Sequence, residues 1–210
     1  MTEVRLVYFP IRGLGEQIRL LFVDNGVPFV DQHVQFGAEW KKLKPEMQFG
    51  RVPCLYDGQL EISESGAIMR HLARKHDLYG STEDDKILAD VIYEGVKDLH
   101  IKYSKLVYEE FEKKPDYIAN FLPVELGKLE GLIKTRNSGR GFILGGDKTC
   151  FADYTLFEEL SIHLVLDPSC LDNFSTLQSY HGRMKARPNL QEYLNSSERK
   201  NIKINWGDNQ

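Results

Sequence analysis

The sequence predicts an α/β half followed by an all-helical half. Three observations predict this order: a β-α-β pattern opens the chain, a β-hairpin that runs into a helix ends the first half, and helical periodicity alone continues after residue 83. A polar, turn-rich stretch, His76-Asp77-Leu78-Tyr79-Gly80-Ser81, separates the two patterns. We therefore expect one domain at residues 1–78, a linker at 79–83 and a second domain at 84–210.

The first three elements follow from an apolar run, a helical period and a second β-prone run. Residues 4–9 are apolar and β-prone except for Arg5, which is typical of a buried strand. Apolar residues then recur at helical spacing over residues 14–22, and Gly26 is well suited to end that helix. A second strand begins at Pro28. This β-α-β unit occupies about thirty residues, the minimum for a parallel pair of strands.

The next elements are a poorly patterned stretch, a hairpin and a helix. Residues 35–48 have no clear period, so we expect a loop or a short helix there. Residues 52–56 and 60–62 are short β-prone runs, and Asp57-Gly58 between them is a strong hairpin signal because both residues tolerate a positive φ. Residues 63–65 supply the N-cap of the helix that follows. The α/β half therefore reads β-α-β-α-β-β-α.

The hairpin and its helix carry two features of a binding site. If the Val52-Pro53 bond is cis, the backbone N–H and C=O of Val52 turn outward, where they can pair with an extended ligand. Glu64 and Ser65 place a carboxylate, a hydroxyl and backbone N–H groups at a helix start, which attracts anionic groups. A small extended peptide with both charges at one end would suit this arrangement. An ordinary hairpin with an ordinary N-cap explains the same residues equally well.

The second half shows only helical periods. A glycine-rich loop at residues 137–146 interrupts them, and the tail after residue 195 is expected to be irregular. Asp153 is placed to accept a hydrogen bond from the backbone N–H of Cys150, half of a capping box. The expected helices are 83–111, 115–136, 151–166, 174–186 and 188–195.

Composition excludes several classes of protein. Hydrophobic residues make up 41% and charged residues 28%, as in ordinary globular domains. The net charge is −4, and no basic stripe interleaved with aromatic residues occurs, so we expect no nucleic acid partner. No apolar run is long enough to span a bilayer and the start lacks a signal peptide core, so we expect a cytoplasmic protein without membrane association. The three cysteines, Cys54, Cys150 and Cys170, lack metal-type spacing, so we expect no metal.

Several motifs, taken together, resemble the cytosolic glutathione transferases over nearly the whole chain. Tyr8 follows the first strand, Val52-Pro53 precedes the hairpin, and Glu64-Ser65 begins a helix; Gly95-Val96-Lys97-Asp98-Leu99 and Phe151-Ala152-Asp153-Tyr154 follow in the helical half. Within that family the chain is most similar to the pi class, and in part to the pi-like enzymes of nematodes. The motifs that carry this similarity are Tyr8-Phe9-Pro10-Ile11-Arg12-Gly13, Ser65-Gly66, Ile68-Met69-Arg70-His71-Leu72 and Ala186-Arg187-Pro188.

The resemblance implies a fold and an activity. It implies a thioredoxin-like N-terminal domain, an all-helical C-terminal domain, a cis Val52-Pro53 bond and a homodimer in which Phe49 anchors the interface. The implied reaction is conjugation of the thiolate of reduced glutathione, a co-substrate, to hydrophobic electrophiles, as in detoxification. Two alternatives stay open at this point: a glutathione-dependent prostaglandin isomerase and a non-catalytic ligand-binding or structural relative of the same fold.

The resemblance also implies roles for particular residues. Tyr8 is expected to stabilise the glutathione thiolate as a neutral hydrogen-bond donor, since a phenol of pKa about 10 is a poor base for a more acidic thiol. Asp98 is expected to reach glutathione from the partner subunit. The glutathione-binding residues implied are Tyr8, Trp40, Lys44, Arg51, Val52, Pro53, Glu64, Ser65 and Asp98. The hydrophobic-substrate residues implied are Phe9, Ile11, Ser104 (or its neighbour Tyr103), Tyr108, Asn205 and Trp206.

Four positions depart from the pattern of the pi class. Leu14 stands where an arginine is frequent, which predicts a lower affinity for glutathione. Glu64 and Arg51 both stand in place of glutamine, and we expect Arg51 to offset the repulsion between Glu64 and the carboxylate of the ligand. Trp206 replaces a small residue, which predicts a narrower or differently shaped substrate pocket.

Overall fold

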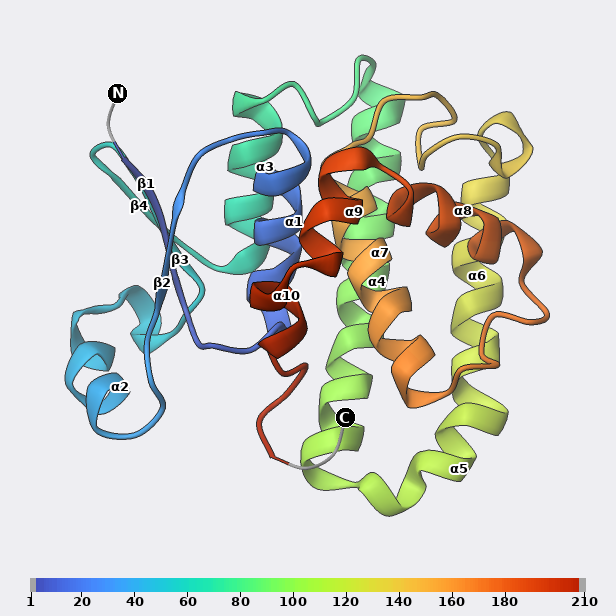
Figure 1. Ribbon diagram of the computed structural model, residues 1–210. Helices are drawn as coiled ribbons and strands as arrows, with labels where there is room; N and C mark the ends of the chain where they lie inside the picture. The colour runs from blue at the N-terminus through green and yellow to red at the C-terminus, as the bar shows by residue number, and fades with distance from the viewer. Residues whose placement is uncertain (1–2, 208–210) are drawn as a thin grey trace. The chain divides into compact units, whose positions relative to one another are not determined.

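A computed structural model describes residues 3–207 of the chain, which form two compact units (Figure 1). The first unit contains residues 3–76 together with Arg187–Trp206, and the second contains Asp77–Ala186. The first is a mixed α/β unit and the second is all-helical, so the predicted fold class is confirmed. Within residues 3–207, no helix combines the length and the apolar character needed to cross a bilayer. The exact domain boundaries given above stay a prediction.

The first unit is built on a four-stranded mixed sheet in the order β2-β1-β3-β4. β1 pairs with β2 in parallel, with Tyr8 opposite His33, and with β3 in antiparallel. The predicted hairpin between β3 and β4 forms, but its two-residue turn begins at Gly58, with φ +64°, because Asp57, expected in the turn, ends β3 and pairs with Leu60. The strands are β1 (Val4–Tyr8), β2 (Val30–His33), β3 (Cys54–Asp57) and β4 (Leu60–Ser63).

Helices lie on both faces of this sheet, with α1 and α3 on one face and α2 toward the other (Figure 1). The stretch at residues 35–48, expected to be a loop or a short helix, contains α2 and short 3₁₀ turns. Val7, Val34 and Cys54 form a buried core on the α2 side, where Trp40 and Leu43 pack against them. The helices of residues 3–76 are η1 (Gly13–Gly15), α1 (Glu16–Asp24), α2 (Ala38–Leu43), η2 (Lys44–Glu46), η3 (Gln48–Gly50) and α3 (Ser65–Lys75).

The last segment of the first unit, α9 (Pro188–Asn195) and α10 (Ser197–Asn201), packs against α1. Arg187 forms an ion pair with Asp24 at 2.7 Å, and Arg199 forms one with the buried Glu16. The sequence predicts an irregular tail, which is wrong in part, because α10 forms there with its start capped by the Ser196 hydroxyl. Polar and ionic bonds to α1 therefore fix this segment in the first unit.

The second unit is a set of helices around α7. The predicted helix at 115–136 is interrupted, because residues 117–121 form a π-helical turn before α6 begins. α4 starts with a complete capping box between Thr82 and Asp85. The helices of this unit are α4 (Glu83–Glu109), η4 (Phe111–Lys113), α5 (Lys114–Asp116), η5 (Tyr117–Phe121), α6 (Leu122–Lys134), η6 (Asn137–Gly139), α7 (Phe151–Leu166) and α8 (Ser175–Lys185).

The start of α7 is closed by a buried carboxylate. Asp153 accepts a hydrogen bond from the Cys150 backbone N–H at 2.7 Å, as the sequence predicts, and a second from the Ile143 N–H at 3.0 Å. Burial raises the pKa of Asp153 to about 6, although these two hydrogen bonds oppose the shift. One carboxylate thus caps α7 and also fastens the preceding loop to it.

Candidate functional site

Tyr8 is the last residue of β1, and its side chain is only 6% exposed. Its hydroxyl oxygen accepts a hydrogen bond from the Leu14 backbone N–H at 3.0 Å. A phenol oxygen that accepts a hydrogen bond becomes a stronger donor through its own proton, because bonds in a chain polarise one another. The β1 strand therefore ends in a hydroxyl group that is polarised for donation.

Two glycines leave the space in which the Tyr8 ring lies. A Cβ at Gly13 would lie 2.5 Å from the Tyr8 hydroxyl oxygen, and a Cβ at Gly15 would lie 2.4 Å from Cδ1 of the ring. Gly13 also has φ +37°, a backbone conformation that side chains disfavour. The loop after β1 thus accommodates Tyr8 only while these positions lack side chains.

Arg19 in α1 binds the backbone of the same loop. Its Nη1 donates to the Ile11 carbonyl at 2.9 Å, and its Nε pairs with Asp31 at 2.6 Å. Burial opposes its charge, but the carboxylates of Glu16 and Asp31 raise the pKa of Arg19 above its ordinary value. The guanidinium lies 5.8 Å from the centre of the Tyr8 ring. A permanent buried cation therefore ties β2 and the loop together beside Tyr8.

An aromatic cluster surrounds Phe9, the residue after Tyr8. The Phe9 ring packs edge-on against Trp40 at 5.3 Å between centroids, Phe36 at 5.8 Å and Trp206 at 6.2 Å. The Phe36 ring in turn lies 5.7 Å from Trp206, and the Phe36 side chain is 64% exposed. This cluster forms an apolar surface next to the Tyr8 end of β1.

The hairpin and the start of α3 have the features proposed for a binding site. The Val52-Pro53 bond is cis, as the sequence predicts. Ser65 is the first residue of α3 and is buried, whereas Glu64 before it has φ +67° and makes no side-chain cap bond. The sequence predicts an N-cap from residues 63–65, and Glu64 takes that position, although its side chain makes no cap bond. The Glu64 carboxylate instead lies 3.7 Å from the Arg51 guanidinium.

The structure brings together part of the predicted residue set. Tyr8, Phe9, Trp40 and Trp206 are joined by ring contacts, while Lys44 at the start of η2 lies with its aliphatic stem against Gly50. Ile11 and Asn205 are both buried in the first unit, and backbone pairing joins Ile11 to Lys203. The remaining predicted residues, all on α4 of the second unit, are Asp98, Tyr103, Ser104 and Tyr108.

Sequence reasoning missed residues that shape the site without belonging to a known motif. Gly13 follows a strand-end tyrosine by five residues, and a glycine in the loop after a strand was a usable signal for close backbone approach. Arg19 shows a weaker signal, a charge among the apolar residues of a buried helix. Phe36 lies in a stretch with no period, and no sequence feature identifies it.

Comparison with known protein families identifies the chain. The model of the glutathione S-transferase N-terminal domain matches residues 4–74, and that of the glutathione S-transferase C-terminal domain matches residues 97–197. The chain belongs to the glutathione S-transferase family. Among the described residues, this transferase has no group of three or more His, Cys, Asp or Glu side chains arranged to hold a metal ion.

Individual relatives point to one class within the family. A glutathione S-transferase of Dirofilaria immitis is 46% identical over 98% of this transferase and 99% of its own length. A Caenorhabditis elegans relative named glutathione S-transferase P is 45% identical over 99% of each chain. The solved structure of a pi-class glutathione S-transferase from Onchocerca volvulus covers all of both chains at 46% identity with a TM-score of 0.96. The predicted similarity to pi-class and nematode enzymes is confirmed.

Proposed function

We propose that this transferase conjugates the thiolate of reduced glutathione to hydrophobic electrophiles, and that Tyr8 stabilises the thiolate. The observation that carries the proposal is the Tyr8 hydroxyl, held at the end of β1 against Gly13 and polarised by the Leu14 N–H at 3.0 Å. The family membership supports the reaction class. No observation favours the isomerase or the non-catalytic alternative.

The energetic demand on Tyr8 is modest. A free thiol of pKa about 8.5 is only a few per cent ionised at pH 7, and lowering its pKa by about two requires ~2.7 kcal/mol. A hydrogen bond to a charged acceptor contributes about 1.5–3 kcal/mol. One well-placed phenol is therefore sufficient, and it acts by donation without losing its proton.

Glutathione is proposed to lie along the hairpin with its γ-glutamyl end at α3. Ser65 at the helix start supports this orientation, because helix N-termini favour carboxylates. The cis peptide before Pro53 supports pairing of the Val52 backbone with the cysteinyl residue. Trp40 and Lys44 are proposed to bind the glycyl carboxylate. From the partner subunit, Asp98 is proposed to meet the γ-glutamyl ammonium.

Arg51 and Glu64 are proposed to act as a pair at the γ-glutamyl end. The Glu64 carboxylate favours the ligand's ammonium group but repels its carboxylate. The Arg51 guanidinium at 3.7 Å offsets part of that repulsion, and both side chains are exposed, so the pair is easily displaced by a ligand. This supports the role inferred for the two departures from glutamine.

The electrophile is proposed to bind on the aromatic cluster of Phe9, Phe36 and Trp206. The contact of Trp206 with Phe9 and Phe36 supports a narrow pocket suited to flat rings. Tyr108 is proposed to donate a hydrogen bond to charge that develops on an epoxide or enone oxygen. The other residues proposed to line the pocket are Ile11, Ser104 and Asn205.

We further propose a cytoplasmic homodimer anchored by Phe49, with residues 1–78 as the glutathione-binding domain and 84–210 as the helical domain. The Phe49 side chain is 79% exposed at φ +55°, which supports a role in an interface, because exposed aromatic anchors dominate such contacts. In sedimentation, Phe49→Ala should shift the protein toward monomer. An unchanged dimer would remove Phe49 as the anchor.

Replacement of Tyr8 by phenylalanine tests the mechanism. The Tyr8→Phe variant should lose about tenfold to a hundredfold in kcat/KM at pH 7, and the pKa of bound glutathione, followed by thiolate absorbance, should rise by about two. Tyr56→Phe removes a hydroxyl from the same sheet outside the site and should leave both values unchanged. An unaltered thiol pKa in Tyr8→Phe would refute the proposed role.

A further inference from the structure

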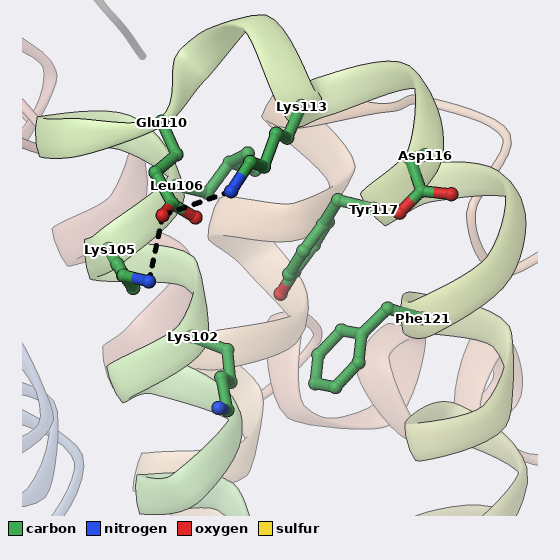
Figure 2. Close-up of a pocket in the computed structure, with 8 residues that line it drawn as sticks. All are labelled: Lys102, Lys105, Leu106, Glu110, Lys113, Asp116, Tyr117 and Phe121. Atoms are coloured by element: carbon green, nitrogen blue, oxygen red, sulfur yellow. Dashed lines mark ion pairs between the residues drawn. The ribbon is translucent and has the colours of Figure 1, made fainter.

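A pocket of about 230 Å³ lies entirely within the second unit, between the C-terminal part of α4 and the turns η4 to η5 (Figure 2). None of its lining residues belongs to the site proposed above. Its wall is apolar and its rim is basic, a combination that a transferase reaction at Tyr8 does not explain.

The apolar wall is made by Leu106, Tyr117 and Phe121. Tyr117 and Phe121 stand at the two ends of the π-helical turn at residues 117–121, and side chains four positions apart lie on the same side of a helix. The Tyr117 and Phe121 rings consequently lie next to each other, 5.1 Å between centroids and inclined at 38°, on one side of the pocket (Figure 2). Single π-helical turns occur frequently at functional sites.

The hydroxyl of Tyr117 is directed into the core, which leaves its ring for the pocket. His163 is buried, and burial lowers its pKa, so its imidazole is neutral. Its Nδ1 donates to the Glu159 carbonyl at 2.8 Å, and Nε2 is therefore the acceptor for the Tyr117 O–H at 2.9 Å. Burial raises the pKa of Tyr117, so the phenol keeps this proton. The polar end of Tyr117 is thus fixed by a bond inside the unit.

The rim carries more positive than negative charge. Lys105 and Lys113 share one carboxylate, that of Glu110, at 2.8 and 3.0 Å. Lys102 also lines the pocket. Asp116, the second acid that lines the pocket, accepts a hydrogen bond from the Asn120 side chain at 2.7 Å. Three ammonium groups against two carboxylates leave a net positive rim beside an aromatic wall.

We propose that this pocket binds a small aromatic carboxylate. The flat ring of the ligand lies against Tyr117 and Phe121, and its carboxylate meets Lys102, with Lys105 and Lys113 as further donors. Aromatic rings stack in offset or edge-on geometry, which the 38° inclination of the wall accommodates. Because the pocket is small, it admits one or two fused rings with a single anionic group.

The test is a titration of the intact enzyme with 2-naphthoate in the presence of saturating S-hexylglutathione, which fills the catalytic site. Wild type should bind 2-naphthoate more tightly than the neutral 2-naphthylmethanol. In Lys102→Glu the affinity for 2-naphthoate should fall about tenfold, because the charge that meets the ligand's carboxylate is reversed. The affinity for the uncharged alcohol should not change. Phe121→Ala should weaken both compounds.

The control is Lys128→Glu, which reverses an exposed lysine on α6 that pairs with Glu125 at 2.7 Å, outside the pocket. It should leave the 2-naphthoate affinity unchanged. The proposal is overturned if Lys102→Glu changes that affinity no more than Lys128→Glu does, if Phe121→Ala has no effect, or if S-hexylglutathione abolishes binding. These outcomes do not depend on whether Tyr8 stabilises the thiolate.

Discussion

The N-termini of α3 and α7 differ in whether a nearby carboxylate of the chain accepts backbone hydrogen bonds. At α7, Asp153 lies inside the unit and accepts two backbone N–H bonds, from Cys150 and Ile143. At α3, the N-cap residue Glu64 has φ +67°, its side chain makes no cap bond, and it pairs instead with the exposed Arg51. A side chain of α7 therefore makes hydrogen bonds at the N-terminus of that helix, whereas the N-cap residue of α3 makes no side-chain cap bond.

We infer from this difference that the α7 N-terminus serves stability and that the α3 N-terminus is left for the proposed ligand. A positive φ at a non-glycine residue costs about 1–3 kcal/mol and persists only where the surrounding structure enforces it. Such strain tends to cluster at binding sites. The α3 start presents a helix dipole to an anion without a capping side chain in the way. At α7 the Asp153 carboxylate instead binds the backbone just before the helix.

Removal of the α7 cap should have the largest effect. Asp153→Ala leaves two buried N–H groups without their acceptor, so the free energy of unfolding should fall by about 2 kcal/mol in urea denaturation. The kcat of the folded fraction should be unchanged. A loss of turnover with intact stability would contradict the structural role of this helix start.

Substitution of Gly13 tests whether the position of the Tyr8 phenol depends on the absence of a side chain at residue 13. A Cβ at Gly13 would lie 2.5 Å from the Tyr8 hydroxyl, so Gly13→Ala should displace the phenol, lower kcat about tenfold and raise the pKa of bound glutathione by about one. Gly26→Ala is a matched control, because Gly26 also has positive φ, +62°, but open space around its Cβ position. Equal losses in both variants would assign the effect to backbone strain alone.

The pH dependence of stability distinguishes the buried acid at α7 from an exposed one. The folded pKa of Asp153, about 6, lies above its unfolded value near 3.8, so its contribution is complete below pH 3.8 and is lost as pH rises through about 6. The stability advantage of wild type over Asp153→Ala should therefore be about 1 kcal/mol larger at pH 5 than at pH 7. A constant difference would show that the carboxyl is not perturbed.

Relief of the strain at α3 should give the smallest effect and the opposite sign. In Glu64→Gly the positive φ no longer carries a steric cost, and the net gain in unfolding free energy should be about 0.5–1 kcal/mol after the entropy of glycine is subtracted. The affinity for glutathione should fall about threefold, since an ion partner for the ammonium is lost. Calorimetry measures the unfolding free energy and the glutathione affinity of this variant. Tighter glutathione binding together with lower stability in Glu64→Gly would contradict the inference that the α3 N-terminus is strained to serve a ligand.

The resemblance to a known family, rather than local pattern, assigned the role of Tyr8. The cis Val52-Pro53 bond was also implied by that resemblance and agrees with the chemistry of proline, which alone makes such bonds common. The N-cap falls within residues 63–65 as predicted, at Glu64, but a propensity for capping does not reveal that Glu64 is held at φ +67° and paired with Arg51. The π-helical turn at residues 117–121 was also missed, because one inserted residue leaves the apolar period almost unchanged.

By itself, the sequence determined the order of most strands and helices and the two-part division. Those properties depend on short-range periodicity and on the turn residues that interrupt it. The tertiary structure decided that Trp206 meets Phe9 and Phe36, that Arg187 pairs with Asp24, and that the Tyr8 ring fills the space left by Gly13. Close packing sets these contacts, and most of them join residues far apart in the chain, which no local pattern records.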